Sequence, residues 1–199
     1  MKVVIIKYNA GSVQSVLFAL ERMGVKGILS DNPQEIISAD KVIFPGVGEA
    51  SSAMQYLKEK KLNKAIINLK QPVLGICLGM QLLCKHSEEG NTACMGIFPL
   101  QVKKFTPDLK AEEKYKVPQI GWNNISSLRG KLFEGVKENE YVYFVHGYYA
   151  EQGNYTIAKT NYILEYSSAL QKNNFYGAQF HPEKSSLSGQ IVLENFLRL

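Results

Sequence analysis

Apolar runs and amphipathic segments alternate through the first ninety residues of the chain. Four short apolar runs predict buried strands, namely "VVII", "GILS", "KVIFPG" and "QPVLGI". The segments between and after them carry apolar residues at helical spacing: "VQSVLFALERMG", "NPQEII", "EASSAMQYLKEKKLNKAIINL" and "LGMQLLCKHSEE". Strands that alternate with helices indicate βαβ units, so we expect a parallel sheet with helices on both faces.

The pattern changes after residue 90. Short segments rich in β-branched and aromatic residues follow one another, separated by turn residues, and they predict strands that are largely antiparallel. The last segment, "SLSGQIVLENFLRL", returns to helical spacing. Because no linker or internal repeat interrupts the chain, we expect one α/β domain over residues 1–199. Its central sheet should be mostly parallel and flanked by helices, with antiparallel strands added in the C-terminal half.

Composition and charge exclude several classes of protein. The chain is 45% hydrophobic and 21% charged, and no apolar run reaches the length of a membrane span. The N-terminus "MKVVIIKYNAGS" does not resemble a signal peptide, and three widely spaced cysteines favour a reducing cytoplasm over a disulfide framework. The net charge is +5, but the lysines are scattered among acidic residues. We therefore expect no nucleic-acid partner and no membrane association.

Cys77 stands where a strand turns into a helix. It follows the apolar "VLGI", precedes "LGMQLL", and has Gly75 and Gly79 close on either side. This is the arrangement of a nucleophile elbow, in which a tight turn lifts one reactive side chain above the edge of the sheet. Glycines are needed there because strand and helix pack too closely for side chains. The alternative is a small buried cysteine at a glycine-rich turn.

His181 and Glu183 come two residues apart after the apolar segment "NFYGAQF". In extended backbone both side chains face the same way, so the carboxylate can accept the Nδ1–H of the imidazole and leave Nε2 free to exchange protons with a thiol. Pro182 between them stiffens the pair. An ordinary surface pair is the alternative. His86, in "CKHSEE", is interpreted as a surface histidine on the helix that follows Cys77.

A backbone-rich loop, "VIFPGVG", follows the third predicted strand. Its amides at Val47 and Gly48, with the amide of Leu78 after the cysteine, are candidates for an oxyanion hole. The loop lacks a Walker lysine, so a phosphate-binding role is disfavoured. A thiol, a histidine–carboxylate pair and backbone donors together predict acyl transfer through a thioester. The cysteines and histidines do not cluster, so we expect neither a metal nor a cofactor.

"GICLGMQ" followed at a distance by "HPE" resembles the class I glutamine amidotransferases, which have a flavodoxin-like fold and a Cys-His-Glu triad. The resemblance runs essentially end to end. "DKVIFPGVGEASSAM", "KVPQIGWN", "YVYFVHGYY" and "QFHPEKS" are similar to one branch, the glutaminase subunits of imidazole glycerol phosphate synthase. This resemblance implies that Cys77, His181 and Glu183 hydrolyse glutamine to glutamate and ammonia, and that Gln81 helps to hold the glutamine.

The resemblance also implies a partner. His146, Gly147 and Tyr148 match the family's stretch along the substrate pocket. The ammonia would pass to a TIM-barrel cyclase in a heterodimer, which forms imidazole glycerol phosphate in histidine biosynthesis. The positions that match the expected interface are Pro118, Ile120, Trp122, Asn123 and Lys184. A lone tryptophan in a loop rich in glycine and asparagine favours a surface anchor over a core aromatic at Trp122.

Two alternatives follow from departures near the pocket and the partner face. Gln119 stands where a histidine is usual, and Gly147 where a small hydroxyl residue is common. These differences leave open a paralogue that feeds ammonia to a synthetase acting on bacterial surface sugars. A second alternative is a binding module with latent activity, because the family resemblance implies that the loop at Gly46–Gly48 must reorient when the partner binds.

Overall fold

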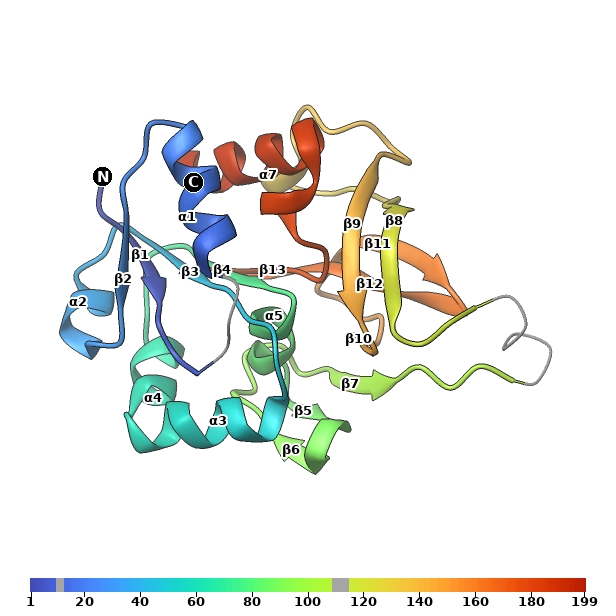
Figure 1. Ribbon diagram of the computed structural model, residues 1–199, viewed down its shortest axis with the longest axis horizontal. Coiled ribbons are helices and arrows are strands. Elements are labelled where there is room, and N and C mark those ends of the chain that lie inside the picture. The colour runs from blue at the N-terminus through green and yellow to red at the C-terminus, as the bar shows by residue number, and fades with distance from the viewer. Residues whose placement is uncertain (10–12, 109–114) are drawn as a thin grey trace.

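The computed structural model describes residues 1–9, 13–108 and 115–199. The first half of the chain forms strands and helices in alternation (Figure 1). Its strands are β1 (Val3–Ile6), β2 (Gly27–Ser30), β3 (Lys41–Phe44) and β4 (Val73–Ile76). Its helices are α1 (Val13–Arg22), α2 (Pro33–Ile37), α3 (Ala50–Glu59), α4 (Leu62–Ile67) and α5 (Leu78–Leu83).

The second half is dominated by strands. They are β5 (His86–Ser87), β6 (Thr92–Ala93), β7 (Gln101–Lys104), β8 (Gln119–Asn124), β9 (Tyr141–His146), β10 (Tyr148–Ala150), β11 (Thr156–Tyr162), β12 (Leu164–Lys172) and β13 (Phe175–Ala178). The helical elements are the short 3₁₀ turns η1 (Glu89–Asn91), η2 (Lys131–Phe133) and η3 (Pro182–Lys184), and the C-terminal helix α7 (Ser186–Arg198).

One mixed sheet runs through the molecule in the order β2-β1-β3-β4-β13-β12-β10-β7-β5-β6, with β11 paired to β12. The pairs from β2 to β13 are parallel, and β12 runs antiparallel to β13, β10 and β11. The expected change from a parallel to an antiparallel sheet is therefore confirmed. The register of β13 with β4 pairs Ala178 with Ile76, so the chain leaves both strands at the same edge of the sheet.

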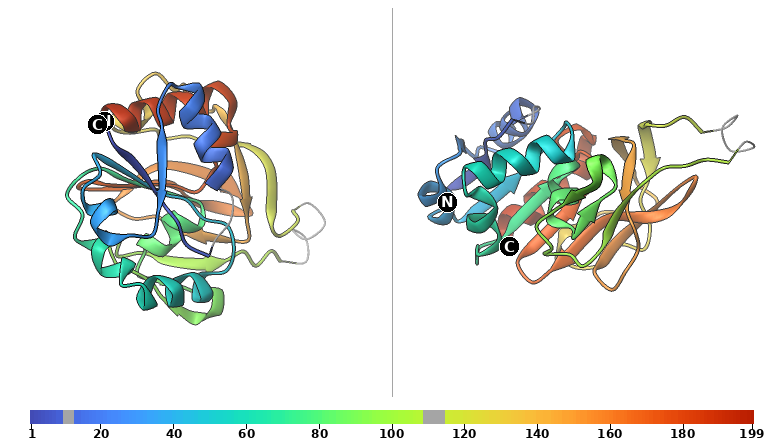
Figure 2. Two further views of the ribbon diagram at one scale, coloured as in Figure 1. Left: turned by 60° about the vertical axis from the view of Figure 1, so that its left-hand side comes forward. Right: turned by 90° about the horizontal axis from the view of Figure 1, so that it is seen from below.

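Helices cover both faces of the parallel part (Figures 1 and 2). Helices α1 and α7 lie on one face, and α3, α4 and α5 lie on the other. Strand β1 shows why its sequence is a continuous apolar run. Val3 and Ile5 pack on the side of α1 and α7, whereas Val4 and Ile6 pack on the side of α3 and α4. All four side chains are fully buried, each contributing roughly 1.5–3 kcal/mol of hydrophobic stabilisation.

Strands β8 and β9 form a separate two-stranded antiparallel sheet, which we call the β8–β9 ribbon. Its register pairs Gln119 with His146 and Trp122 with Tyr143. In Figure 1 the ribbon stands beside the antiparallel part of the main sheet, on the side away from α2 and β2. A backbone hydrogen bond ties it to the segment after β13, since the amide of His181 donates to the carbonyl of Tyr143 over 2.9 Å.

Two predicted boundaries were wrong. The long helix expected after residue 48 is broken into α3 and α4, because Lys61 adopts a left-handed conformation with φ 57°. The helix after Cys77 ends at Leu83, and His86 lies in β5 rather than on that helix, since its strand pairs with β7. The segment "YVYFVHGYYA" is two strands, which separate at Gly147.

Candidate active site

Cys77 occupies the tight turn between β4 and α5. Its backbone has φ 53° and ψ −111°, a conformation that L-residues rarely adopt and that costs on the order of 1–3 kcal/mol. The neighbouring glycines make the turn possible. A Cβ on Gly79 would overlap the carbonyl oxygen of Phe44, and one on Gly75 would lie 2.8 Å from the amide nitrogen of Met80. The turn therefore has the geometry of the predicted nucleophile elbow.

His181 and Glu183 form a buried pair beside this elbow. The Nδ1 atom of His181 lies 2.8 Å from Oε1 of Glu183, and both side chains are almost entirely buried. The reason differs from the one expected from the sequence. His181 is in extended backbone, but Glu183 lies in the 3₁₀ turn η3, so the turn and not strand alternation brings the carboxylate to the imidazole. The hydroxyl of Ser185 closes the turn by donating to the carbonyl of His181 over 2.6 Å.

The electrostatics of the pair favour a charged imidazole. Burial disfavours the imidazolium, but hydrogen bonding and negative charge from Cys77 and Glu183 outweigh it and raise the pKa of His181 to about 10. A protonated His181 next to the cysteine is the state that can hand a proton to a leaving group. The same carboxylate fixes the tautomer, because it takes the Nδ1–H and directs Nε2 away from itself.

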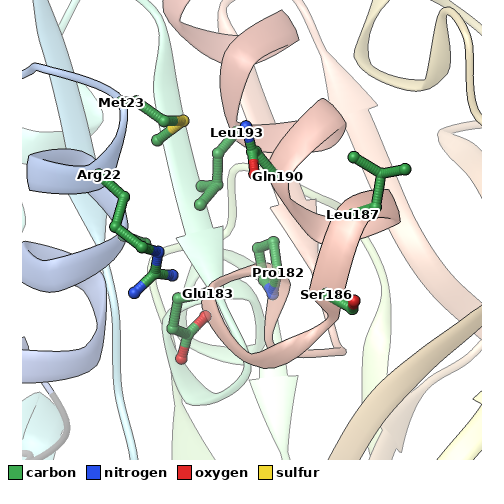
Figure 3. A pocket seen from close by; sticks show the side chains of 9 residues that line it. Arg22, Met23, Pro182, Glu183, Ser186, Leu187, Gln190 and Leu193 are labelled. Atoms are coloured by element: carbon green, nitrogen blue, oxygen red, sulfur yellow. The ribbon is translucent and has the colours of Figure 1, made fainter.

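A cavity of about 350 Å³ lies behind the pair, between α1 and α7 (Figure 3). The second carboxylate oxygen of Glu183, Oε2, is buried and has no hydrogen-bond partner. Figure 3 shows the guanidinium of Arg22 extended toward Glu183 from α1. Among the residues that line this cavity, Arg22 is the one that carries a positive charge. The rear of the Glu183 carboxylate thus faces a cation rather than apolar side chains alone.

The pocket in front of Cys77 is smaller, about 240 Å³. Its lining unites residues from five separate segments of the chain. They are Val47, Gly48, Cys77, Leu78, Gln81, Glu89, Pro118, Val145, His146, Gly147 and Tyr148. All the predicted oxyanion and substrate residues are among them. Glu89 was not anticipated, and its carboxylate accepts the amide of Ala50 over 2.9 Å while partial burial raises its pKa.

The side chain of Gln81 lines the pocket and is held by two hydrogen bonds. Its Nε2 donates to the carbonyl of Tyr148 over 3.0 Å and to Oε1 of Gln179 over 2.9 Å. The amide of Gln179 in turn lies 3.7 Å from the sulfur of Cys77. Gln179 was missed from the sequence. The available signal was its place two residues before His181, which puts a polar side chain on the same face of an otherwise apolar strand.

His146 is buried at the end of β9, where the ribbon meets the pocket. Its Nδ1 lies 2.7 Å from the carbonyl of Tyr148, and its Nε2 lies 3.1 Å from the hydroxyl of Tyr166. That hydroxyl is also 2.9 Å from the side-chain oxygen of Gln119. Burial lowers the pKa of His146 to about 4, and the charge of His181 adds to this effect. His146 is therefore neutral and shares a buried polar network with Tyr166 and Gln119.

One of the predicted oxyanion donors, the amide of Leu78, makes a hydrogen bond within the chain. The amide of Leu78 donates to the carbonyl oxygen of Gly46 over 3.2 Å, so this N–H is occupied by the chain itself. Gly48, two residues further, has φ 128°, which is a glycine conformation. The role of Leu78 as an oxyanion donor stays a prediction, because in this conformation its amide is occupied by the carbonyl of Gly46.

Comparison with known proteins agrees with this geometry. The family model described as glutamine amidotransferase class-I matches residues 4–199. The chain belongs to the class I glutamine amidotransferases. Solved structures support the fold of this amidotransferase. A glutamine amidotransferase from Thermotoga maritima has a TM-score of 0.65 at 18% identity, covering 100% of this chain and 83% of its own. PurLQS from Thermotoga maritima has a TM-score of 0.68 at 13% identity, covering 99% and 97%.

Relatives of higher identity belong to one branch of the family. A protein of Bacteroides fragilis strain YCH46, named imidazole glycerol phosphate synthase subunit HisH, is 54% identical over 199 residues, which is all of both chains. A protein of Vibrio vulnificus strain YJ016, named imidazole glycerol phosphate synthase subunit HisH 1, is 45% identical over 206 residues, covering 100% of this chain and 98% of its own. The amidotransferase therefore groups with the HisH subunits.

Three of the five residues predicted at a partner interface lie in β8, and they fall on both faces of the ribbon. Ile120 and Trp122 alternate along β8 and are 65% and 52% exposed. Asn123 lies on the opposite face, where its side-chain amide donates to the carbonyl of Asn161 in β11 over 3.0 Å. Pro118 lines the front pocket, and Lys184 is exposed on η3. The outward face of the amidotransferase ribbon is thus apolar, and Asn123 is not part of it.

In the described residues, no helix is long and apolar enough to cross a membrane, and no group of three or more histidine, cysteine or acidic side chains has the arrangement of a metal site. The three cysteines are free. Burial raises the pKa of Cys94 to about 11 and that of Cys84 further still. Cys84 packs in the core among apolar side chains, in agreement with a structural role.

Proposed function

We propose that this amidotransferase is the glutaminase subunit of an imidazole glycerol phosphate synthase, acting in the cytoplasm in histidine biosynthesis. The observation that carries the proposal is the side-chain contact of Cys77, which lines the front pocket, with His181, which is itself paired with Glu183. The pathway is supported by the full-length similarity to proteins named imidazole glycerol phosphate synthase subunit HisH.

The proposed reaction divides glutamine hydrolysis into two acyl transfers. The sulfur of Cys77 attacks the side-chain carbonyl carbon of glutamine, and a C–S bond forms as the carbonyl oxygen becomes an oxyanion. The intermediate collapses as the C–N bond breaks, and His181 gives its proton to the departing nitrogen, so ammonia leaves. His181 then takes a proton from water, which attacks the thioester and releases glutamate and the thiol. Glu183 orients the imidazole throughout.

The pocket supplies groups that match the polar ends of glutamine. Glu89 offers a carboxylate for the α-ammonium, and the side chain of Gln81 lies on the pocket wall with its amide nitrogen held by Tyr148 and Gln179. His146 and Tyr148 complete the wall on the ribbon side. This arrangement favours a small amino acid that places its α-ammonium at Glu89 and its uncharged side-chain amide beside Cys77 and His181.

We further propose that a TIM-barrel cyclase binds the outward face of the β8–β9 ribbon and receives the ammonia. Exposed apolar side chains at Ile120 and Trp122 are the kind of residues that anchor protein interfaces. The pocket wall and the ribbon share β9, because His146 ends that strand. Ammonia released at Cys77 would therefore emerge beside the surface that the partner covers.

The contact between Leu78 and Gly46 supports a resting state in the free chain. One oxyanion donor typically contributes roughly 100- to 1,000-fold to the rate, so its occupation by a loop carbonyl would hold the glutaminase nearly inactive. Partner binding would then turn the loop and release the amide. Such gating avoids wasteful hydrolysis of glutamine when no acceptor for ammonia is present.

The test is glutamate release from glutamine, measured for the chain alone and with the cyclase of the same organism and its ribotide ligand. We expect the cyclase to stimulate release by roughly 100-fold or more, and Cys77→Ala to abolish it while the variant still binds the partner. Absence of stimulation by a cyclase that is active on free ammonia would contradict the proposal and point to a paralogue with a different synthetase.

A further inference from the structure

The hydroxyl of Tyr8 is buried without a hydrogen-bond partner. Tyr8 follows β1, is 7% exposed, and packs its ring against Phe44 at a centroid distance of 5.2 Å. In the described part of the chain three buried side-chain oxygens lack a partner, and this hydroxyl is one of them. A buried hydroxyl that makes no hydrogen bond destabilises the folded chain, so native proteins rarely retain one without a use for it.

The hydroxyl lies against the backbone of Gly46. A Cβ built on Gly46 would overlap it, which explains why this loop position has no side chain. The carbonyl of the same residue accepts the amide of Leu78 in the present conformation. Tyr8 therefore touches the residue whose carbonyl occupies the oxyanion donor. Burial and the nearby charge of Cys77 raise the pKa of Tyr8 well above its usual value, so the hydroxyl keeps its proton and can donate it.

Release of the Leu78 amide creates a second requirement. When the carbonyl of Gly46 turns away from Leu78, it loses its donor at a position that is itself buried. A buried carbonyl without a donor is costly, so the turned loop needs a replacement donor close by. The Tyr8 hydroxyl is a donor at hand that breaks no existing hydrogen bond when it is used.

We propose that Tyr8 is a positioning residue for the oxyanion loop, donating its hydroxyl proton to the carbonyl of Gly46 in the catalytically competent conformation. This inference rests on the proposed glutaminase function and adds to it the group that holds the active loop. The resting chain keeps the hydroxyl unsatisfied, and the active chain satisfies it. Tyr8 thus favours the active conformation without touching the substrate.

Tyr8→Phe should affect the stability of the free chain and the rate of the stimulated enzyme in opposite directions. Removing a hydroxyl that has no partner at rest takes away a buried, unsatisfied polar group, so the free chain should be as stable as the wild type or more stable. Removing the donor for Gly46 in the active state should lower the partner-stimulated kcat roughly tenfold, with KM for glutamine close to the wild-type value. A purely structural tyrosine would not show this combination.

Tyr176→Phe is the matched control. Tyr176 is also 7% exposed, but its hydroxyl accepts the side-chain amide of Gln171 over 3.2 Å. Its loss should lower the melting temperature and leave the stimulated kcat unchanged, opposite to Tyr8→Phe in both respects. The experiment measures thermal unfolding of the three free chains, and then glutamate release with the cyclase and its ribotide ligand.

Each outcome decides the proposal. Retained or raised stability of Tyr8→Phe together with a lowered stimulated kcat supports it. A melting temperature lowered as in Tyr176→Phe shows that the hydroxyl is already satisfied at rest, and overturns it. A wild-type kcat in stimulated Tyr8→Phe also overturns it. If the cyclase does not stimulate the wild-type chain, the proposed function is contradicted instead. The basal kcat then decides the role of Tyr8: a lower value for Tyr8→Phe than for the wild type supports it, and an equal value overturns it.

Discussion

The elbow around Cys77 and the β8–β9 ribbon lie on either side of the same pocket and are built in opposite ways. At the elbow, Gly75 and Gly79 are in close contact with neighbouring backbone, and residues from Val73 to Cys84 are buried. The ribbon is a two-stranded sheet on its own, with Ile120, Trp122 and Tyr141 more than half exposed. One region tolerates almost no change of shape, whereas the other offers apolar surface to a partner.

The difference separates the chemistry of the site from its control. A nucleophile must be held to within a fraction of an ångström, which close packing achieves. A surface that receives a partner needs exposed anchors and can remain thin, because its stability is completed by the complex. His146 links the two, since it ends β9 of the ribbon and lines the pocket beside Cys77.

The largest effect that would sharpen this contrast is expected from Gly79→Ala. The added Cβ would overlap the carbonyl oxygen of Phe44 in β3, which is backbone and cannot move aside cheaply. We expect the free energy of unfolding to fall by about 3 kcal/mol or more, measured by urea denaturation. The matched change in the ribbon is Gly121→Ala, which meets no atom within 4 Å and is strained only by its φ of 131°. Its cost should be about 1–2 kcal/mol, and equal losses would break the contrast.

A comparable effect is expected from pH at the junction of the two regions. The pKa of His146 is lowered from 6.5 to about 4 by burial and by the charge of His181, so the unfolded chain binds more protons than the folded one between these values. His146 should therefore lower the free energy of unfolding by about 3 kcal/mol as the pH falls from 6.5 to 4. Above pH 6.5 it should not change that free energy. His146→Asn should show a shallower loss of stability across the same window.

His181 provides the opposite sign in the same molecule. Its pKa is raised to about 10, so its stabilisation is fully present below pH 6.5 and is lost as the pH rises through 10. His146→Asn should leave that alkaline limb unchanged. Urea denaturation of the wild type and of His146→Asn from about pH 4 to about pH 10 measures the acid and alkaline losses of stability separately. An acid limb that is identical in the two proteins would contradict the assignment to His146.

The smallest expected effect is in binding. Trp122→Ala should leave the stability of the free chain within about 0.5 kcal/mol, because the side chain is half exposed. It should weaken the complex with the cyclase by about 2 kcal/mol, or roughly 30-fold in Kd, as measured by calorimetry. Phe18→Ala is the control, since Phe18 has the same 52% exposure and belongs to α1, a helix that lies away from the ribbon (Figure 1). Equal effects of the two changes on Kd would remove the ribbon as the interface.

Local sequence signals were sufficient for the parallel half of the fold and for the elbow. A cysteine between glycines at the junction of an apolar run and a helix strongly favours a tight turn, and the structure has that turn. The pairing of His181 with Glu183 was also predicted, but for the wrong reason, because the turn η3 is not visible in the spacing of two residues alone. Turn chemistry depends on contacts such as that of the Ser185 hydroxyl with the carbonyl of His181.

What the sequence did not reveal depends on residues far apart in the chain. The contact of Gln179 with Gln81 and Cys77 needs β13 beside β4, which is a matter of strand order. The hydrogen bond from the Leu78 amide to the carbonyl of Gly46 depends on how the loop after β3 lies against the start of α5, and local propensities do not determine that. Lys61 ended a helix in a run of good helix formers, so tertiary packing overrode local preference there.

Trp122 has one more consequence, which is optical. It is the single tryptophan among the 199 residues, and it stands half exposed at the surface with its ring edge-on to Tyr143 at 5.9 Å. Nearly all ultraviolet emission excited at the red edge of protein absorption therefore arises from one indole on the ribbon. Covering that indole with a partner would remove water from it and shift its emission to shorter wavelength, so the unmodified protein carries its own fluorescent reporter of complex formation.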